Sequence, residues 1–144
     1  MNYLSILLLL FLSPATWLTD FQKGKAEAAG SNKLIVLNFS GSDWCGPCIR
    51  LKKEIFESNA FENYSSEKLV LVNADFPRYK KNQLSKEQVK ENESLAEKYN
   101  STGRFPFTVL LDASGKVLKQ WDGFPGETPE KFVDEIKAFD NAGQ

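Results

Sequence analysis

The chain alternates short, almost uniformly apolar runs with longer amphipathic or polar segments. Two runs, 33–39 and 69–75, are apolar at nearly every position, which predicts strands that are buried on both faces of a sheet. Two further β-prone runs, 104–111 and 116–121, flank an Asp-Ala-Ser-Gly turn and predict a hairpin. The pattern therefore predicts at least four strands, two of them joined directly.

Helical patterns lie before and between these strands. The spacing of apolar and small residues over 17–29 predicts an amphipathic helix, with Thr16 or Thr19 as its N-cap. A second helix is expected over 49–56, directly after the first buried strand. The segment 59–64 is typical of a short turn or a single helical turn.

The second half of the chain contains one long polar stretch and a final helix. Residues 78–100 carry a capping pattern, Ser85 followed by Gln88, and predict a charged loop with one or two helices. Charges of both signs favour a solvated face there, with a partner surface as the alternative. Thr128 as cap and Pro129 at the first position predict the start of the last helix. The alternation of helices and strands, without repeats or linkers, predicts a single α/β domain.

The N-terminus has a different pattern. Residues 3–12 are apolar apart from one serine, and Ser13-Pro14-Ala15 follows, which predicts a secretory signal peptide over 1–15 and a mature domain over 16–144. The apolar run is shorter than the roughly 20 residues that a membrane span needs. A buried helix or an uncleaved anchor is the alternative, because no Lys or Arg precedes the run.

Composition excludes several classes of function. A length of 144 residues with 42% hydrophobic residues fits one domain with a proper core. The formal net charge of −1 argues against a nucleic-acid partner, since no basic surplus is available to neutralise phosphates. The chain has no histidine, which rules out Cys–His and Ser–His–Asp nucleophile systems and His-ligated zinc. Two cysteines alone make a poor metal site, so redox chemistry is the function left for them.

These two cysteines, Cys45 and Cys48, lie at the turn between the strand 33–39 and the helix 49–56. The unpaired N–H groups and partial positive charge of a helix N-terminus stabilise a thiolate, and the thiolate is the nucleophile in disulfide exchange. A second cysteine three positions later can close back on the first and release a mixed disulfide. Cys45 is therefore expected to attack and Cys48 to resolve.

The segment Trp44-Cys45-Gly46-Pro47-Cys48 resembles the active-site pentapeptide of thioredoxins, in the strand-to-helix context of that family. The order of elements over 17–139 also resembles the thioredoxin fold. The resemblance implies an α/β protein with a central mixed β-sheet flanked by helices, and a thiol-disulfide oxidoreductase that needs no cofactor and no metal.

The resemblance also implies a substrate-binding site around the cysteines. Its members are Trp44, Gly46 and Pro47 of the motif, Phe105 and Pro106 at the position of the family's cis proline, and Gly123 in a turn that resembles the glycine turn beside the family's groove. A cis X–Pro bond exposes neighbouring backbone groups to an extended substrate. An edge-strand proline and an ordinary turn are the alternatives.

The first strand departs from the family pattern. Where thioredoxins commonly bury an Asp that accepts the proton of the resolving cysteine, this chain has Asn38, which cannot take up a proton at neutral pH. The Lys that often pairs with that Asp is also absent, since the matching strand has Asn73. Asp43 and Glu54 are candidate proton acceptors by their proximity in sequence, and a hydrogen-bonded buried amide is the other interpretation of Asn38.

The Gly-Pro dipeptide between the cysteines resembles that of reducing thioredoxins. The resemblance implies a monomeric, exported, periplasmic reductant that acts on cysteine-containing exported proteins and receives electrons from a membrane thiol donor. The alternative is a peptide-binding, chaperone-like module in which Cys45 and Cys48 form a structural disulfide. A peroxide-reducing enzyme is a third, less favoured hypothesis.

Overall fold

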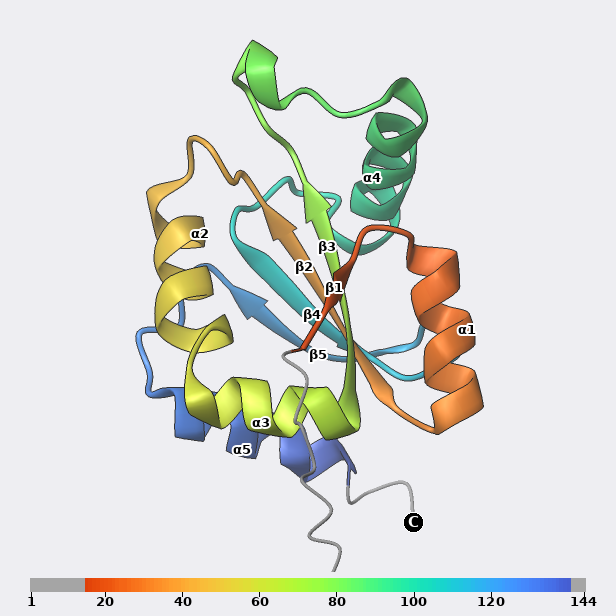
Figure 1. Ribbon diagram of the computed structural model, residues 1–144, viewed down its shortest axis with the longest axis vertical. Helices are drawn as coiled ribbons and strands as arrows, with labels where there is room; N and C mark the ends of the chain where they lie inside the picture. Colours follow the sequence, from red (N-terminus) through yellow and green to blue (C-terminus); the bar gives the residue numbers. More distant parts are fainter. Residues whose placement is uncertain (1–14, 141–144) are drawn as a thin grey trace, which may run out of the picture.

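The computed structural model describes residues 15–140, which form a five-stranded mixed sheet with helices on both faces (Figure 1). The predicted signal peptide lies outside these residues except for Ala15. The strand order is β1-β3-β2-β4-β5; β3 is parallel to β1 and β2, while β4 is antiparallel to β2 and β5. The strands are β1 Trp17–Leu18, β2 Leu34–Ser40, β3 Leu69–Asp75, β4 Phe107–Leu111 and β5 Val117–Asp122.

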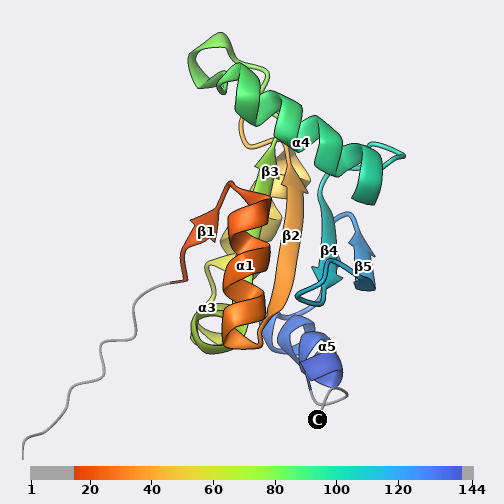
Figure 2. The same cartoon turned by 90° about the vertical axis from the view of Figure 1, so that its right-hand side faces the viewer.

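The helices form two layers around this sheet. One face is covered by α1 and α4, which lie in front of the sheet in Figure 2, and the other face by α2, α3 and α5. Within the described residues, no helix is long and apolar enough to cross a membrane. The helices are α1 Phe21–Ser31, α2 Gly46–Leu51 with its π-helical continuation η1 Lys52–Phe56, α3 Asn59–Lys68, the 3₁₀ turn η2 Lys80–Asn82, α4 Lys86–Tyr99 and α5 Pro129–Asp140.

Side-chain alternation along the central strand β2 decides what lies beneath α2. Ile35, Leu37 and Phe39 are fully buried in the core that α1 and α4 cover. The intervening positions face the opposite layer, where the strand ends with Asn38 and Ser40. A run that is apolar almost throughout therefore carries two polar side chains to the cysteine side of the sheet.

The prediction of a helix over 17–29 is wrong at its start. Trp17–Leu18 form strand β1, which pairs in parallel with β3 at the edge of the sheet. The helix begins at Phe21, and its N-cap is Asp20 instead of Thr16 or Thr19. The Asp20 carboxylate accepts a backbone N–H of the first turn at 3.0 Å, which satisfies a donor that the helix leaves unpaired.

The single turn predicted at 59–64 is also wrong, because α3 continues to Lys68. Ser58 caps the helix by accepting the N–H of Phe61 at 3.2 Å, and the Phe61 ring is fully buried against α5. The two buried strands, the hairpin, the Ser85 cap of α4 and the Thr128 cap of α5 are confirmed.

Candidate redox site

Cys45 and Cys48 form a disulfide at the junction of β2 and α2, with an S–S distance of 2.11 Å. Cys45 is the N-cap of α2, and its Sγ accepts the backbone N–H of Cys48 at 3.3 Å. Pro47 occupies the first turn of the helix, where a missing N–H costs no helical bond. Both cysteines are 5% exposed, whereas Gly46 and Pro47 between them are exposed. The local sequence thus presents Cys45 Sγ at a helix N-terminus.

Trp44 is fixed on three sides next to Cys45. Its indole Nε1–H donates to the carbonyl oxygen of Phe76 at 2.7 Å. The Arg78 guanidinium stacks on the indole at 3.7 Å from a ring centroid, and the Phe105 ring meets it edge-on at 5.5 Å. Gly41 makes room for the ring, because a Cβ at that position would lie 2.2 Å from an indole atom.

Of the remaining predicted substrate-site residues, Phe105 contacts Trp44. The Phe105–Pro106 peptide bond is cis, as the resemblance to thioredoxins implies, and Phe105 carries the ring that contacts Trp44. The carbonyl oxygen of Pro106 accepts the N–H of Gly123 at 2.9 Å. Gly123 has φ +80°, a backbone conformation that favours glycine. The structure therefore links Trp44 to Phe105 and Gly123 to Pro106, and Pro106 itself is buried.

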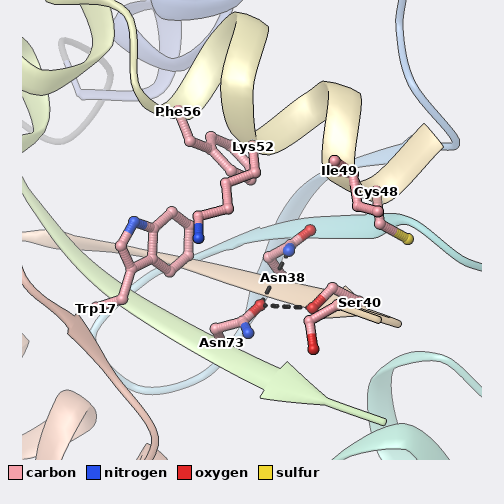
Figure 3. Close-up of a pocket in the computed structure, with 9 residues that line it drawn as sticks. Trp17, Asn38, Ser40, Cys48, Ile49, Lys52, Phe56 and Asn73 are labelled. Carbon is pink, nitrogen blue, oxygen red and sulfur yellow. Dashed lines mark hydrogen bonds between the residues drawn. The ribbon is translucent and has the colours of Figure 1, made fainter. Parts of the chain in front are cut away.

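A cavity of about 300 Å³ lies beside Cys48, under the start of α2 (Figure 3). Asn38 lines this cavity. The Asn38 Nδ2 donates to Asn73 Oδ1 at 3.0 Å, and the Asn38 Oδ1 accepts from the hydroxyl of Thr108 at 3.1 Å. Asn38 is thus a hydrogen-bonded amide, 6% exposed, in a cavity that Cys48 also lines. The cavity is lined by Trp17, Asn38, Ser40, Ser42, Cys48, Ile49, Lys52, Phe56 and Asn73.

Neither carboxylate that the sequence offered as a proton acceptor lines this cavity. Asp43 accepts the backbone N–H groups of Arg78 and Tyr79, each at 2.9 Å, and the Asn82 amide at 3.0 Å. Burial raises the pKa of the Asp43 carboxyl, but these hydrogen bonds outweigh it and hold that pKa below its ordinary value. Glu54 pairs with Arg50 at 2.9 Å on the exposed face of the helix. Proximity in sequence was misleading because both side chains bond elsewhere.

Asp75 is the carboxylate that the sequence analysis missed. Its Oδ1 accepts the Ser40 hydroxyl at 3.3 Å and the Ser42 N–H at 2.9 Å, and its Oδ2 accepts the Ser42 hydroxyl. Both serines line the cavity beside Cys48. Alternation along β3 was a signal for it, since Asn73 and Asp75 must face the same layer. Among residues 15–140, no three or more His, Cys, Asp or Glu side chains are arranged to hold a metal ion.

The sequence and structure match known proteins over most of the described chain. The family model of the thioredoxin-like domain matches residues 21–140. The disulfide bond reductase DsbH of Chlamydia pneumoniae is 40% identical over 107 residues, which are 74% of this chain and 62% of that protein. The thioredoxin-related protein DsbJ of Chlamydia pneumoniae is 25% identical over 83% of this chain and 34% of its own length. This chain thus spans less than two thirds of either curated relative.

A solved structure of a DsbH oxidoreductase superimposes with a TM-score of 0.79 at 32% identity, covering 88% of this chain and 84% of that one. The expected fold, a mixed sheet flanked by helices, is therefore confirmed. The protein belongs to the thioredoxin-like family.

Proposed function

We propose that this protein is a thiol-disulfide oxidoreductase that reduces disulfides in other proteins, with Cys45 as nucleophile and Cys48 as resolving cysteine. The observation that carries the proposal is the position of Cys45 Sγ at the N-terminus of α2, where it accepts the Cys48 N–H. That N–H and the helix dipole stabilise a thiolate at Cys45. Cys48 is already within bonding distance, since the two sulfurs form a disulfide.

The reaction has two sulfur exchanges. The Cys45 thiolate attacks one sulfur of the substrate disulfide, a mixed disulfide forms, and the first substrate thiolate leaves and takes up a proton. The Cys48 thiol then loses its proton and attacks Cys45 Sγ, which releases the second substrate thiolate, and this too becomes protonated. Two electrons pass to the substrate, and the protein is left with the Cys45–Cys48 disulfide. An external dithiol must reduce this disulfide to complete the cycle.

The surface around Cys45 supplies a place for the substrate chain. Trp44 and Phe105 lie edge to face on one side, and the half-buried Gly123 donates to the carbonyl oxygen of the buried Pro106. Gly46 and Pro47 are exposed at the start of α2, so a substrate can approach the disulfide from above the helix. Substrate binding is therefore assigned to Trp44, Gly46, Pro47, Phe105, Pro106 and Gly123.

The proton of Cys48 leaves through the cavity beneath α2. Asn38 and Asn73 are neutral and bonded to each other, so neither accepts it. The cavity of about 300 Å³ has room for water beside its polar side chains, and Ser40 and Ser42 connect it to the Asp75 carboxylate. In the proposed route the proton passes from Cys48 through water and a serine hydroxyl to Asp75.

The direction of electron flow and the location are part of the same proposal. The uncharged residues between the cysteines, Gly46 and Pro47, favour the reducing end of the thioredoxin range, which runs from about −270 mV to about −120 mV. The apolar run at the N-terminus supports export to the periplasm, followed by cleavage after Ala15. Substrates are then cysteine-containing exported proteins, and the electron donor is a membrane thiol protein. N-terminal sequencing of the exported protein tests the cleavage.

The deciding experiment measures the reduction potential of the Cys45–Cys48 pair against glutathione and dithiothreitol buffers. A value of about −250 mV or lower supports a reductant, and a value above about −180 mV overturns that direction. The Cys45→Ser variant should lose all disulfide-reducing turnover, while Cys48→Ser should accumulate a mixed disulfide with the substrate. A pair that does not exchange in the folded protein would instead identify a peptide-binding module with a structural disulfide.

A further inference from the structure

The loop that follows β3 is strongly basic. Residues 76–86, called the basic loop below, contain Arg78, Lys80, Lys81 and Lys86 and no acidic residue, although the whole chain has a formal net charge of −1. All four side chains are exposed, and none of them forms an ion pair within residues 15–140. Figure 1 shows the loop, in green, projecting from the end of β3 beyond the sheet.

The basic loop is fastened to the segment that carries Cys45. Asp43, two residues before Cys45, accepts the N–H groups of Arg78 and Tyr79 and the Asn82 amide at 2.9–3.0 Å. The N–H of Phe76 donates to the Ser40 carbonyl oxygen at 2.9 Å. The backbone of the loop at Phe76, Arg78 and Tyr79 is therefore held at a defined position relative to the segment that carries Cys45.

Among the four cations of this loop, Arg78 is the one that stacks on an aromatic ring of the described residues. Its guanidinium lies over the Trp44 indole at 3.7 Å, and the indole is itself held by the Phe76 carbonyl and the Phe105 ring. Stacking occupies the face of the guanidinium and leaves its N–H donors, which lie in its plane, directed outward. Within the described chain these side-chain donors make no hydrogen bond. A fork fixed in this way is suited to bind a carboxylate with two parallel bonds at a small entropic cost.

We propose that the basic loop, with Arg78 at its centre, binds an acidic segment of the substrate protein beside the disulfide that Cys45 attacks. The inference rests on the proposed function and adds a substrate class to it. Tyr79, 55% exposed, adds an aromatic surface next to the cations. A peptide carboxylate fits better than an anionic membrane, because Arg78 stacks on Trp44 beside the reactive cysteine instead of lying on a broad basic plane.

Binding is tested without redox chemistry on the Cys45→Ser, Cys48→Ser double variant. Fluorescent linear peptides that differ only in two Glu, Gln or Lys residues beside a central Ser are titrated by anisotropy. The Glu peptide should bind about tenfold more tightly than the Gln peptide, and rising salt should reduce the difference. When added to the double cysteine variant, Arg78→Gln should remove most of the preference for the Glu peptide. Arg78→Glu should instead make the Lys peptide the one that binds most tightly.

Arg50→Gln is the matched control. Arg50 is also an exposed arginine stacked on an aromatic ring, Phe124 at 4.8 Å, but its charge is already paired with Glu54. Its substitution should leave the preference unchanged. Thermal unfolding and the far-UV circular dichroism spectrum establish that the Arg78 variants stay folded. Equal binding of the three peptides, or a preference that survives Arg78→Gln, would overturn the inference.

Turnover distinguishes this inference from the proposed function. The reduced wild-type protein is given disulfide-bridged dimers of Glu and Gln peptides in which Cys replaces the central Ser, and the ratio of their kcat/KM values is measured. The acidic-segment site is supported if the Glu peptide has a kcat/KM about tenfold above that of the Gln peptide and if Arg78→Gln lowers this ratio to about one. Equal reduction of both peptides overturns the site and leaves the proposed function intact, whereas no reduction of either overturns the function. Binding to phosphatidylserine vesicles without a preference among peptides would identify the loop as a membrane contact and overturn the inference.

Discussion

Asn38 and Asn73 face each other across the paired strands β2 and β3, and the side-chain amide of Asn38 donates to the amide oxygen of Asn73 at 3.0 Å. The hydrogen bond between the two side-chain amides runs in one direction, from Asn38 to Asn73. Asn73 Oδ1 accepts from both Asn38 and the Ser40 hydroxyl, while Asn38 Oδ1 accepts from Thr108. The arrangement thus has a donor at position 38 and an acceptor at position 73, and neither amide is ionisable, although Lys52 also lines the cavity.

The direction of this bond predicts unequal effects of two Asn-to-Asp substitutions. Asn38→Asp replaces the donor with a carboxylate oxygen facing Asn73 Oδ1 and should lower the free energy of unfolding by about 1–3 kcal/mol at pH 7. Asn73→Asp keeps the two hydrogen bonds that the side-chain oxygen of residue 73 accepts, so it should lower the free energy of unfolding by less. Urea unfolding of the two variants measures the difference, and equal losses would contradict the assigned direction.

The free energy of unfolding of Asn38→Asp should also depend on pH. An Asp at position 38 can donate to Asn73 only when protonated, so its folded-state pKa should lie above its unfolded value. A raised pKa gives a stabilising contribution that is complete below the unfolded pKa and is lost as pH rises through the folded one. The stability gap between Asn38→Asp and the wild type should therefore narrow in acid. A gap that does not change with pH would contradict the prediction.

Gly41→Ala should displace Trp44. The added Cβ would lie 2.2–2.5 Å from three indole atoms, so the ring must leave its bond to Phe76 and its stack with Arg78. We expect a loss of about 1–3 kcal/mol in unfolding free energy, a changed Trp fluorescence spectrum and reduced turnover. Gly30→Ala is the control, because no atom lies within 4 Å of its Cβ and helix α1 should gain up to about 1 kcal/mol. A wild-type spectrum and turnover in Gly41→Ala would show that Trp44 is not held as described.

Asp43 should fasten the basic loop in a pH-dependent way. Its pKa is lowered from the ordinary 3.8, since the Arg78 and Tyr79 N–H groups and the Asn82 amide outweigh the effect of burial. A lowered pKa gives a contribution that is present above the unfolded value and is lost as pH falls through the folded one. The Arg78 and Tyr79 amide protons should therefore lose protection, measured against their intrinsic exchange rate at each pH, as pH falls below the ordinary value of 3.8. Amide exchange followed by NMR measures this change.

Asp43→Asn distinguishes the effect of protonating the Asp43 carboxylate from the effects of acid on other groups. Asn offers one acceptor oxygen in place of two, so the same amides should exchange faster at neutral pH and show a smaller change in acid. If the Arg78 and Tyr79 amides of the variant behaved like those of the wild type, the carboxylate would not be what holds the loop.

Local patterns in the sequence were sufficient for much of this site. The apolar runs predicted β2 and β3, and the short Cys45–Cys48 spacing after a strand predicted the disulfide at a helix N-terminus, because each signal lies within a few residues. The Trp17–Leu18 strand was missed since it forms only by pairing with β3, more than fifty residues away. The Arg78–Trp44 stack joins residues 34 positions apart, so no local period could reveal it.

Asp75 should govern the second step of the reaction and not the first. In Asp75→Asn the amide oxygen can still accept hydrogen bonds from the Ser40 hydroxyl and the Ser42 N–H. The new amide N–H₂ can donate to the Ser42 hydroxyl, so the fold should be preserved. The variant cannot take the Cys48 proton. Release of the second substrate thiol should slow by about 100-fold near neutral pH, with little change in formation of the mixed disulfide.

Acid quenching and mass spectrometry can follow the two steps of this reaction separately. In Asp75→Asn the mixed disulfide should accumulate, and its decay should accelerate with pH, because direct loss of the Cys48 proton to solvent becomes easier. Ser40→Ala interrupts one hydroxyl link while keeping the carboxylate and should produce a smaller version of the same pH profile. A purely structural role for Asp75 would lower both rates by one factor at every pH. An unchanged decay rate would mean that the Cys48 proton leaves by another path, since the cavity would then need no carboxylate.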